Sequence, residues 1–297
     1  MSAELRVTPF FGCMISMKLP QFEAAVRRTV DKLGVELVDL EGFACCPDPL
    51  YYKTRDKMTW LILAARNLCV AEDAGLDIVT CCSGCTATLS EARAMLTEDE
   101  ALCAEVNGKL KAIGREFKGT IQVKHIATLI REEIGLEKVR DSVTHPLTDL
   151  KVAIHYGCHL LKPSHIMQVD DPDHPTILEE LIRAVGATPL NHEEKLLCCG
   201  KACNDPDLPP KMLLEVMRSV NKLDVHCMAL ICPTCFDSFD FGQIKLKRMF
   251  DEEFHIPVVY YFQLLALAQG IAPAEVGLHW HKIKTDNILE VVGAENA

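Results

Sequence analysis

Short runs rich in β-branched and other apolar residues alternate along the chain with longer segments in which apolar residues recur every three or four positions. In the first half the strand-like runs cover residues 5–11, 34–40 and 76–81, and helical patterns cover residues 21–33 and 56–74. Such alternation is typical of βαβ units, whose strands pair in parallel sheets. The pattern therefore predicts an α/β fold.

The same pattern occurs a second time. Strand-like runs lie at residues 151–155, 187–190 and 226–231. The tails of the halves also agree, because residues 123–130 and 258–265 each pass from a short strand-like run into an apolar helix. We expect two pseudo-symmetric, Rossmann-like repeats with parallel sheets. A polar, proline-containing stretch near residues 141–149 suggests the boundary, which predicts domains at 1–145 and 146–297.

Cysteines follow this repeat. The first half contains Cys13, the pair Cys45–Cys46 and the motif Cys82-x-x-Cys85, and the second half contains Cys158, the pair Cys198–Cys199 and the motif Cys232-x-x-Cys235. Each group follows a strand-like run. Because the carboxyl ends of parallel strands share one rim of a sheet, we expect the cysteines of each half to converge on loops at that rim.

Composition narrows the class of protein. The chain has 297 residues, of which 49% are hydrophobic, so it can bury a large core. Its net charge of −11 and the lack of a basic stripe argue against nucleic-acid binding. No signal peptide and no membrane-spanning run are visible, which predicts a soluble, cytoplasmic protein. Fifteen cysteines in a reducing compartment indicate metal or redox chemistry rather than disulfides.

Thiolate sulfur selects iron–sulfur clusters, zinc or Cu(I). A structural zinc ion takes four ligands, whereas each half offers five cysteines in a 1+2+2 arrangement. Adjacent cysteines reach different irons of one extended cluster more readily than they both bind one ion. The close C-x2-C-x2-C spacing of bacterial ferredoxins is absent. Iron–sulfur clusters are therefore favoured, with zinc as the alternative.

The ten cysteines, with Gly200 after the second pair, resemble the two CCG motifs found in the B subunit of heterodisulfide reductase from methanogens. The resemblance covers the whole chain, with one departure, since Pro47 follows the first pair. It implies a noncubane 4Fe-4S cluster in each half, held by five cysteines. It also implies reduction of the mixed disulfide of coenzyme M and coenzyme B to two thiols, with each cluster supplying one electron.

Electrons must arrive from other proteins, because no G-x-G-x-x-G motif follows a strand. The resemblance implies a ferredoxin-like C subunit that relays electrons from a flavin-containing A subunit. The substrate carries sulfonate, carboxylate and phosphate groups, for which Lys18, Lys162 and Lys201 are candidate cations. Ordinary solvated lysines are the alternative. His155 and His159 flank Cys158 and could protonate a departing thiolate or tune a cluster. His159 is the better candidate of the two.

Five cysteines remain: Cys69, Cys81, Cys103, Cys203 and Cys227. Cys69 and Cys227 lie in apolar segments, which indicates buried, inert side chains. Cys81 is an alternative ligand to Cys82, but only Cys82 keeps the C-x-x-C spacing.

Three alternative functions stay open. The chain also resembles the double-motif subunit of lactate, glycolate, glycerol-3-phosphate or succinate oxidoreductases. A zinc-stabilised scaffold without electron transfer belongs to a different class. Thioredoxin-like dithiols would explain the C-x-x-C motifs but leave the other cysteines unexplained.

Overall fold

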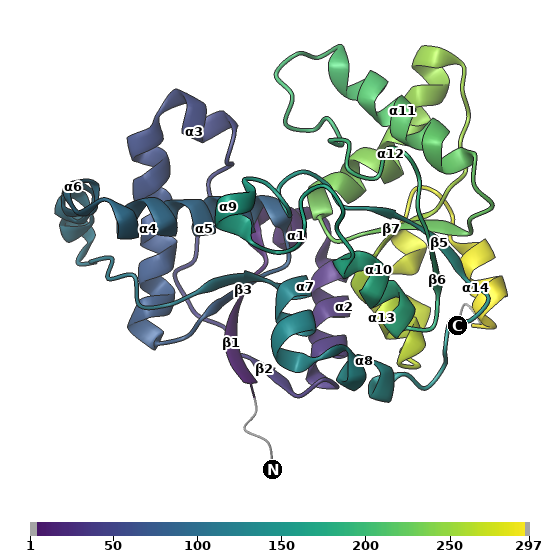
Figure 1. Cartoon of the computed structure of the whole chain (residues 1–297), viewed down its shortest axis with the longest axis horizontal. Coiled ribbons are helices and arrows are strands. Elements are labelled where there is room, and N and C mark those ends of the chain that lie inside the picture. The colour runs from purple at the N-terminus through teal and green to yellow at the C-terminus, as the bar shows by residue number, and fades with distance from the viewer. Residues whose placement is uncertain (1–4, 295–297) are drawn as a thin grey trace.

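The computed structural model describes residues 5–294 and contains two four-stranded parallel sheets (Figure 1). The first has the order β2-β1-β3-β4, and the second has the matching order β6-β5-β7-β8. Their bounds are β1 (Leu5–Phe10), β2 (Val35–Leu37), β3 (Ile78–Thr80), β4 (Val123–His125), β5 (Lys151–His155), β6 (Thr188–Leu190), β7 (Cys227–Leu230) and β8 (Val258–Tyr260). The predicted α/β fold with two parallel-sheet repeats is confirmed.

Helices connect and cover the strands. The first half contains α1 (Gly12–Lys18), α2 (Pro20–Asp31), α3 (Tyr51–Arg55), α4 (Lys57–Ala74), α5 (Ser83–Glu98), α6 (Glu100–Leu110), α7 (Ile126–Leu129) with a π-helical turn at Ile130–Ile134, and α8 (Leu136–Ser142). The second half contains α9 (Ser164–Met167), α10 (Ile177–Ala184), α11 (Leu208–Asn221), α12 (Pro233–Phe250), α13 (Tyr261–Ala268) and α14 (Asp286–Val292). Short 3-10 segments lie at Lys111–Ile113, Pro273–Val276 and Leu278–Trp280.

Local signals explain where the two predicted helices of the first half begin and end. Pro20 occupies the first turn of α2, where its missing N–H costs nothing. Asp56 caps α4, because its Oδ1 accepts a hydrogen bond from the Thr59 N–H at 3.0 Å. Gly75 ends α4 in the left-handed conformation, at φ 63°.

The strand register brings the carboxyl ends of the strands to one rim in each sheet. Phe10 pairs with Thr80, and Thr80 pairs with His125, so β1, β3 and β4 end side by side. His155, Leu230 and Tyr260 repeat this alignment in the second sheet. Residues that follow these strands are therefore neighbours in space, whatever their distance along the chain.

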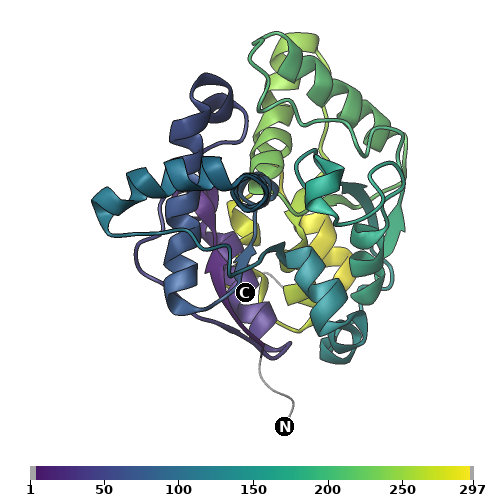
Figure 2. The ribbon, with the colours of Figure 1, turned by 60° about the vertical axis from the view of Figure 1, so that its left-hand side comes forward.

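The two halves pack against each other through α2 and α13, which lie side by side between the sheets (Figures 1 and 2). Phe22 of α2 stacks on the ring of Tyr260, with centroids 4.4 Å apart, and meets Phe236 edge-on at 4.7 Å. The predicted boundary at residues 145/146 falls between α8 and β5, and the division into two domains stays a prediction. Within residues 5–294, no helix is long and apolar enough to cross a membrane.

Candidate metal centre

The cysteines lie at the carboxyl ends of the strands, on one rim of each sheet, and the two rims face each other. In the first half Cys13 lies in the first turn of α1, directly after β1, and the Cys45–Cys46 pair lies in the loop after β2. Cys82 caps the amino-terminal end of α5, directly after β3, with Cys85 in the first turn. The second half repeats these positions: Cys158 follows β5, Cys198 and Cys199 follow β6, Cys232 caps α12 after β7, and Cys235 lies in the first turn.

Within each half the thiols lie in contact. Cys85 Sγ is 3.3 Å from Cys46 Sγ, and Cys158 Sγ is 3.8 Å from Cys198 Sγ. All the cysteines are free thiols. The sulfurs are therefore arranged as neighbouring ligands rather than as disulfides.

Two glycines make room for these thiols. Gly12 has φ +69°, and a Cβ built on it would lie 2.6 Å from Cys85 Sγ. Gly157 occupies the equivalent place, with φ +72° and a Cβ that would lie 3.0 Å from Cys235 Sγ. Glycine is required at both positions because the backbone is left-handed and the sulfur fills the space a side chain would take.

Hydrogen bonds between thiols shift their pKa values in opposite directions. The Cys45 and Cys85 thiols lower the pKa of Cys46 well below its usual value, whereas the Cys46 thiol raises that of Cys45. In the second half the Cys158 thiol lowers the pKa of Cys198, and the Cys198 thiol raises the pKa of Cys158. The neighbouring thiols of each group are therefore close enough to influence one another's ionisation.

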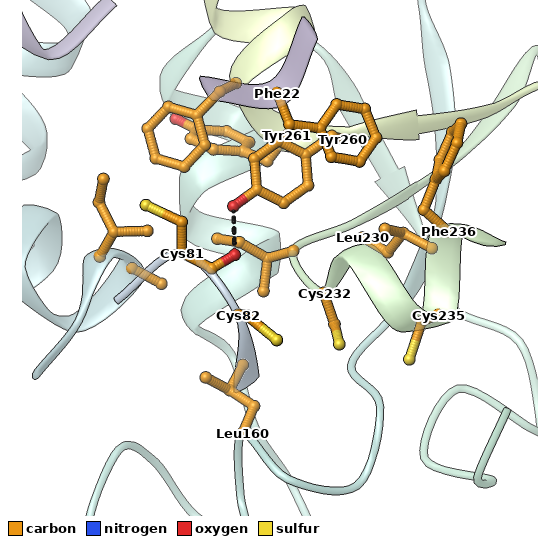
Figure 3. Packing of buried hydrophobic residues seen from close by; sticks show 14 of the residues in the cluster. Phe22, Cys81, Cys82, Leu160, Leu230, Cys232, Cys235, Phe236, Tyr260 and Tyr261 are labelled. Carbon is orange, nitrogen blue, oxygen red and sulfur yellow. Dashed lines mark hydrogen bonds between the residues drawn. The ribbon is translucent and has the colours of Figure 1, made fainter. Parts of the chain in front are cut away.

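The two groups meet at Cys82 and Cys232, whose thiols approach each other from opposite halves (Figure 3). A hydrogen bond between them raises the pKa of Cys82. The pKa of Cys232 is lowered, first by the Cys235 thiol and then by the Cys82 thiol. Pairwise interactions that shift the thiol pKa values connect the ten thiols in one series, in the order Cys13, Cys45, Cys46, Cys85, Cys82, Cys232, Cys235, Cys199, Cys198 and Cys158.

The remaining cysteines lie outside this series. The Cys81 thiol is buried and points away from Cys82 (Figure 3), and burial raises its pKa. Cys69 and Cys227 are buried, and burial raises the pKa of both. Cys103 and Cys203 are partly exposed. The geometry therefore supports Cys82, rather than Cys81, as the ligand of the first C-x-x-C motif.

Polar groups beside the cysteines point to a bound group. Within residues 5–294, the buried atoms without hydrogen-bond partners include Ser83 Oγ, both ring nitrogens of His155, and His159 Nε2. Burial lowers the pKa of His155 to about 3, although the nearby Cys232 and Cys198 oppose the shift. A neutral histidine carries one N–H donor and one acceptor nitrogen. These unsatisfied groups fit a cofactor that accepts hydrogen bonds among the cysteines.

The arrangement fits a cluster better than a single ion. Within residues 5–294, no three His, Cys, Asp or Glu side chains gather in a way that would hold one metal ion. The cysteines instead form a series of neighbouring pairs, five to each half, which suits a group that bridges several thiolates.

Two cavities open beside the second cysteine group. The smaller, of about 60 Å³, lies between the halves and is lined by Asp48, Ser83, Cys158 and His159 among others. The larger, of about 230 Å³, is lined by three lysines together with Phe241 and Leu213. Both cavities share Cys199 and Lys201 in their walls, so they adjoin at the cysteines.

Asp237 brings two of the predicted lysines together in the larger cavity. Its carboxylate is 3% exposed and forms ion pairs with Lys18 of the first half and with Lys201 at 2.7 Å. Burial opposes ionisation of Asp237, but the two lysines outweigh it and lower its pKa. Lys18 also lies over the Phe241 ring, 4.9 Å from its centroid.

Lys162 lies elsewhere. It is exposed, and among the described residues it forms no ion pair and lines neither cavity. Helix α1 carries Lys18 to the inter-half surface, whereas the segment after Cys158 has no such helix before Pro163. Sequence reasoning missed Asp237 and the third cavity lysine, Lys245. Asp237 lies two residues after Cys235, and this position is the sequence signal that would have indicated a residue close to the cysteines.

Comparison with known proteins agrees with this geometry. The family model described as "Cysteine-rich domain" (CCG) matches residues 7–90 and 152–240, once in each half. The chain is 38% identical to the B subunit of the ferredoxin/F(420)H(2)-dependent CoB-CoM heterodisulfide reductase of Methanosarcina acetivorans, over 96% of each chain. It is 30% identical to the "8-methylmenaquinol:fumarate reductase membrane anchor subunit" of Wolinella succinogenes, over 92% of this chain and 95% of that one.

A solved structure shares the fold. The crystal structure of a hypothetical protein from Helicobacter pylori superposes with a TM-score of 0.73 at 16% identity. The match covers 96% of this chain, which spans 53% of that one. The duplicated cysteine motif, the two family matches and the identity over nearly the whole length confirm the resemblance seen in the sequence, and the chain belongs to the CCG cysteine-rich family that includes the B subunits of heterodisulfide reductases.

Proposed function

We propose that this chain is the disulfide-reducing subunit of a cytoplasmic heterodisulfide reductase. In this proposal the ten cysteines of the series hold two noncubane 4Fe-4S clusters, five cysteines to each. The substrate is the mixed disulfide of coenzyme M and coenzyme B. The observation that carries the proposal is the meeting of the two cysteine groups at Cys82 and Cys232, because it lets one substrate contact both.

The reaction breaks one S–S bond and consumes two electrons and two protons to give two thiols. When bound, the clusters supply one electron each and offer iron to the departing sulfurs. The chain supplies the binding site and a proton. His159 lines the cavity between the halves, and its buried Nε2 has no hydrogen-bond partner among residues 5–294. This nitrogen is placed to pass a proton to a departing thiolate.

The lysine cavity holds an anionic end of the substrate. Lys18, Lys201 and Lys245 line it, whereas Asp237 is the only acidic residue among its lining residues, so two positive charges remain uncompensated. Phe241 and Leu213 supply an apolar wall for the chain that links the anionic end to sulfur. Lysines bind sulfonate, carboxylate and phosphate groups through charge-assisted hydrogen bonds. The role predicted for Lys162 stays a prediction.

Partner subunits deliver the electrons. The relatives from Methanosarcina are named as the B subunits of their reductases, which supports a multisubunit assembly. We assign the partner roles to a flavin-containing A subunit and a ferredoxin-like C subunit.

Metal analysis tests this proposal. Anaerobically purified protein should contain about eight irons and a matching amount of acid-labile sulfide per chain. Its EPR spectrum should change when the heterodisulfide is added. A preparation that contains zinc and no iron would reject the proposal and favour the zinc-stabilised scaffold.

A second candidate is the cysteine-rich subunit of a quinol-linked oxidoreductase. The relative from Wolinella succinogenes, which is named for reaction of 8-methylmenaquinol with fumarate, favours it. Reconstituted complex distinguishes the two. Turnover with the soluble heterodisulfide supports the first candidate, and reduction by a quinol without disulfide turnover supports the second.

A further inference from the structure

Tyr260 reaches across the boundary between the halves. It is the last residue of β8, and its hydroxyl donates a hydrogen bond to the backbone carbonyl of Cys81 at 2.7 Å (Figure 3). The side chain is fully buried, and its ring stacks on Phe22 with an interplanar angle of 9°. The hydroxyl is thus aimed at the first half by a ring held between two helices.

The accepting carbonyl belongs to the peptide that leads into Cys82. The carbonyl of Cys82 itself is bound from within the first half, by the Thr86 N–H at 3.0 Å and the Thr86 hydroxyl at 3.1 Å. Tyr260 binds the preceding carbonyl from the other half. The two contacts together restrain the backbone on both sides of the Cys82 Cα.

The backbone of Tyr260 is itself held in place. Its N–H donates to Gln263 Oε1 at 3.1 Å. The amide nitrogen of Gln263 lies 2.9 Å from the Val276 carbonyl and 2.9 Å from His281 Nε2. A donor fixed by such a network is preorganised. Its hydrogen bond therefore also restrains the position of the carbonyl that accepts it.

The repeat places an imidazole, in the opposite direction, where Tyr260 places its hydroxyl. His125 ends β4 as Tyr260 ends β8, and it lies beside Ile231 and Cys232, the counterparts of Cys81 and Cys82. Its Nδ1 accepts a hydrogen bond from the Ala127 N–H of its own helix, and its ring also interacts with the backbone of Ile231, the counterpart of Cys81. Of these two counterpart positions, only the one in the first half is fixed by a hydroxyl from the other half.

We infer that Tyr260 is a positioning residue, whose hydroxyl holds the Cys81–Cys82 peptide and thereby sets the place of the Cys82 thiol against Cys232. The role rests on the proposed function only in so far as Cys82 binds a cluster. The positioning itself concerns the polypeptide and is testable without one.

Tyr260→Phe removes the hydroxyl and keeps the stacked ring, and Tyr261→Phe is the matched control. Tyr261 is the next residue, it is buried, and its hydroxyl has no partner within the described chain. In metal-free, reduced protein the rate of alkylation of each cysteine is followed by peptide mass spectrometry. Cys227, buried in β7, reports global opening. We expect Tyr260→Phe to raise the ratio of the Cys82 alkylation rate to the Cys227 alkylation rate roughly tenfold, because one hydrogen bond is lost. Tyr261→Phe should leave this ratio unchanged.

An unchanged ratio in Tyr260→Phe, or an equal rise in both variants, would overturn the role. In iron-loaded protein, the EPR signal of the first-half cluster is identified as the one that Cys85→Ser removes. Tyr260→Phe should alter this signal. It should leave the signal of the second-half cluster the same as in Tyr261→Phe. Identical spectra in the two tyrosine variants would contradict the inference. Protein that binds no iron but shows the selective rise at Cys82 would reject the proposed function alone.

Discussion

Asp237 is a buried carboxylate whose ionised form is stabilised by two lysines. Its lysines come from opposite halves, and each is about half exposed, so their outer N–H groups stay free to bind a ligand. Partial exposure also means that each ion pair contributes little to stability. In the proposed function, Asp237 therefore positions the lysines for substrate binding rather than for holding the fold together.

Lys201→Gln should raise KM for the anionic heterodisulfide about tenfold and leave kcat within about twofold, because one charge-assisted contact to the substrate is lost. Lys162→Gln is the control, since this lysine is exposed and lies outside the cavity. Steady-state kinetics at low ionic strength measure both. Equal KM values for the two variants would remove Lys201 from the substrate site.

Gly12 illustrates how a residue without a side chain shapes the site. Gly12→Ala should disturb the first cysteine group, because the new Cβ meets Cys85 Sγ. We expect loss of about half the bound iron.

Gly114→Ala is the control, with nearly the same φ of +70° and nothing within 4 Å of its Cβ. The control should lose only about 1 kcal/mol of stability and keep its iron. Iron analysis and thermal unfolding distinguish them, and equal iron loss in both would show that backbone strain, not the thiol contact, matters.

At the level of the elements, the segment after α13 ties strand β8 to helix α13. His281 joins β8 and α13, because Nδ1 binds the Val258 carbonyl at 2.9 Å and Nε2 binds Gln263 at 2.9 Å. Burial lowers the pKa of His281 to about 4. The ring is therefore neutral in the folded chain, with one nitrogen donating and the other accepting.

This shift predicts a dependence of stability on pH. The unfolded chain binds a proton at this residue below pH 6.5, whereas the folded chain does so only near pH 4, so stability falls as the pH drops from 6.5 to 4. Between pH 7.5 and 5 the loss should be about 2 kcal/mol. His281→Gln removes the titrating group, so the stability advantage of the wild type over the variant should shrink by that amount. Denaturant unfolding at the two pH values measures it, and a constant difference would contradict the neutral ring.

Across the whole molecule, duplication places two cysteine groups face to face. Phe22, Tyr260 and Phe236 form an aromatic contact between the halves next to the point where Cys82 meets Cys232. The rims of the two sheets are thus held against each other by the core itself. A reaction that needs two electrons at one bond requires both groups at a fixed separation.

Loss of either group should therefore abolish the reaction rather than halve it. Cys85→Ser or Cys235→Ser should remove one cluster and all disulfide reduction, because one electron cannot complete the cleavage. Cys103→Ser, a partly exposed cysteine outside the series, should keep both the spectrum and the activity. Anaerobic activity assays with EPR check this. Half-maximal turnover in either ligand variant would reject the two-group mechanism.

Much of the architecture is readable from the chain alone. Helices α2 and α4 lie within two residues of their predicted ends, because periodicity and capping residues such as Asp56 act over a few neighbours. The cysteine groups fall after strands because parallel strands expose their carboxyl ends at one rim. The predicted strand at 34–40 is too long, since only Val35–Leu37 pairs with β1. Beyond those residues the chain leaves the sheet toward the Cys45–Cys46 loop.

Contacts between the halves are decided by the tertiary structure. Sequence spacing gives Lys18, Lys162 and Lys201 similar roles, but packing brings two of them to Asp237 and leaves Lys162 outside the cavity. Local sequence likewise gives no sign that the Tyr260 hydroxyl reaches Cys81. Lys18 and Asp237, like Tyr260 and Cys81, lie in different halves and far apart along the chain, and their separation depends on how α2 packs on α13. That packing is the sum of many weak apolar contacts, which no local pattern records.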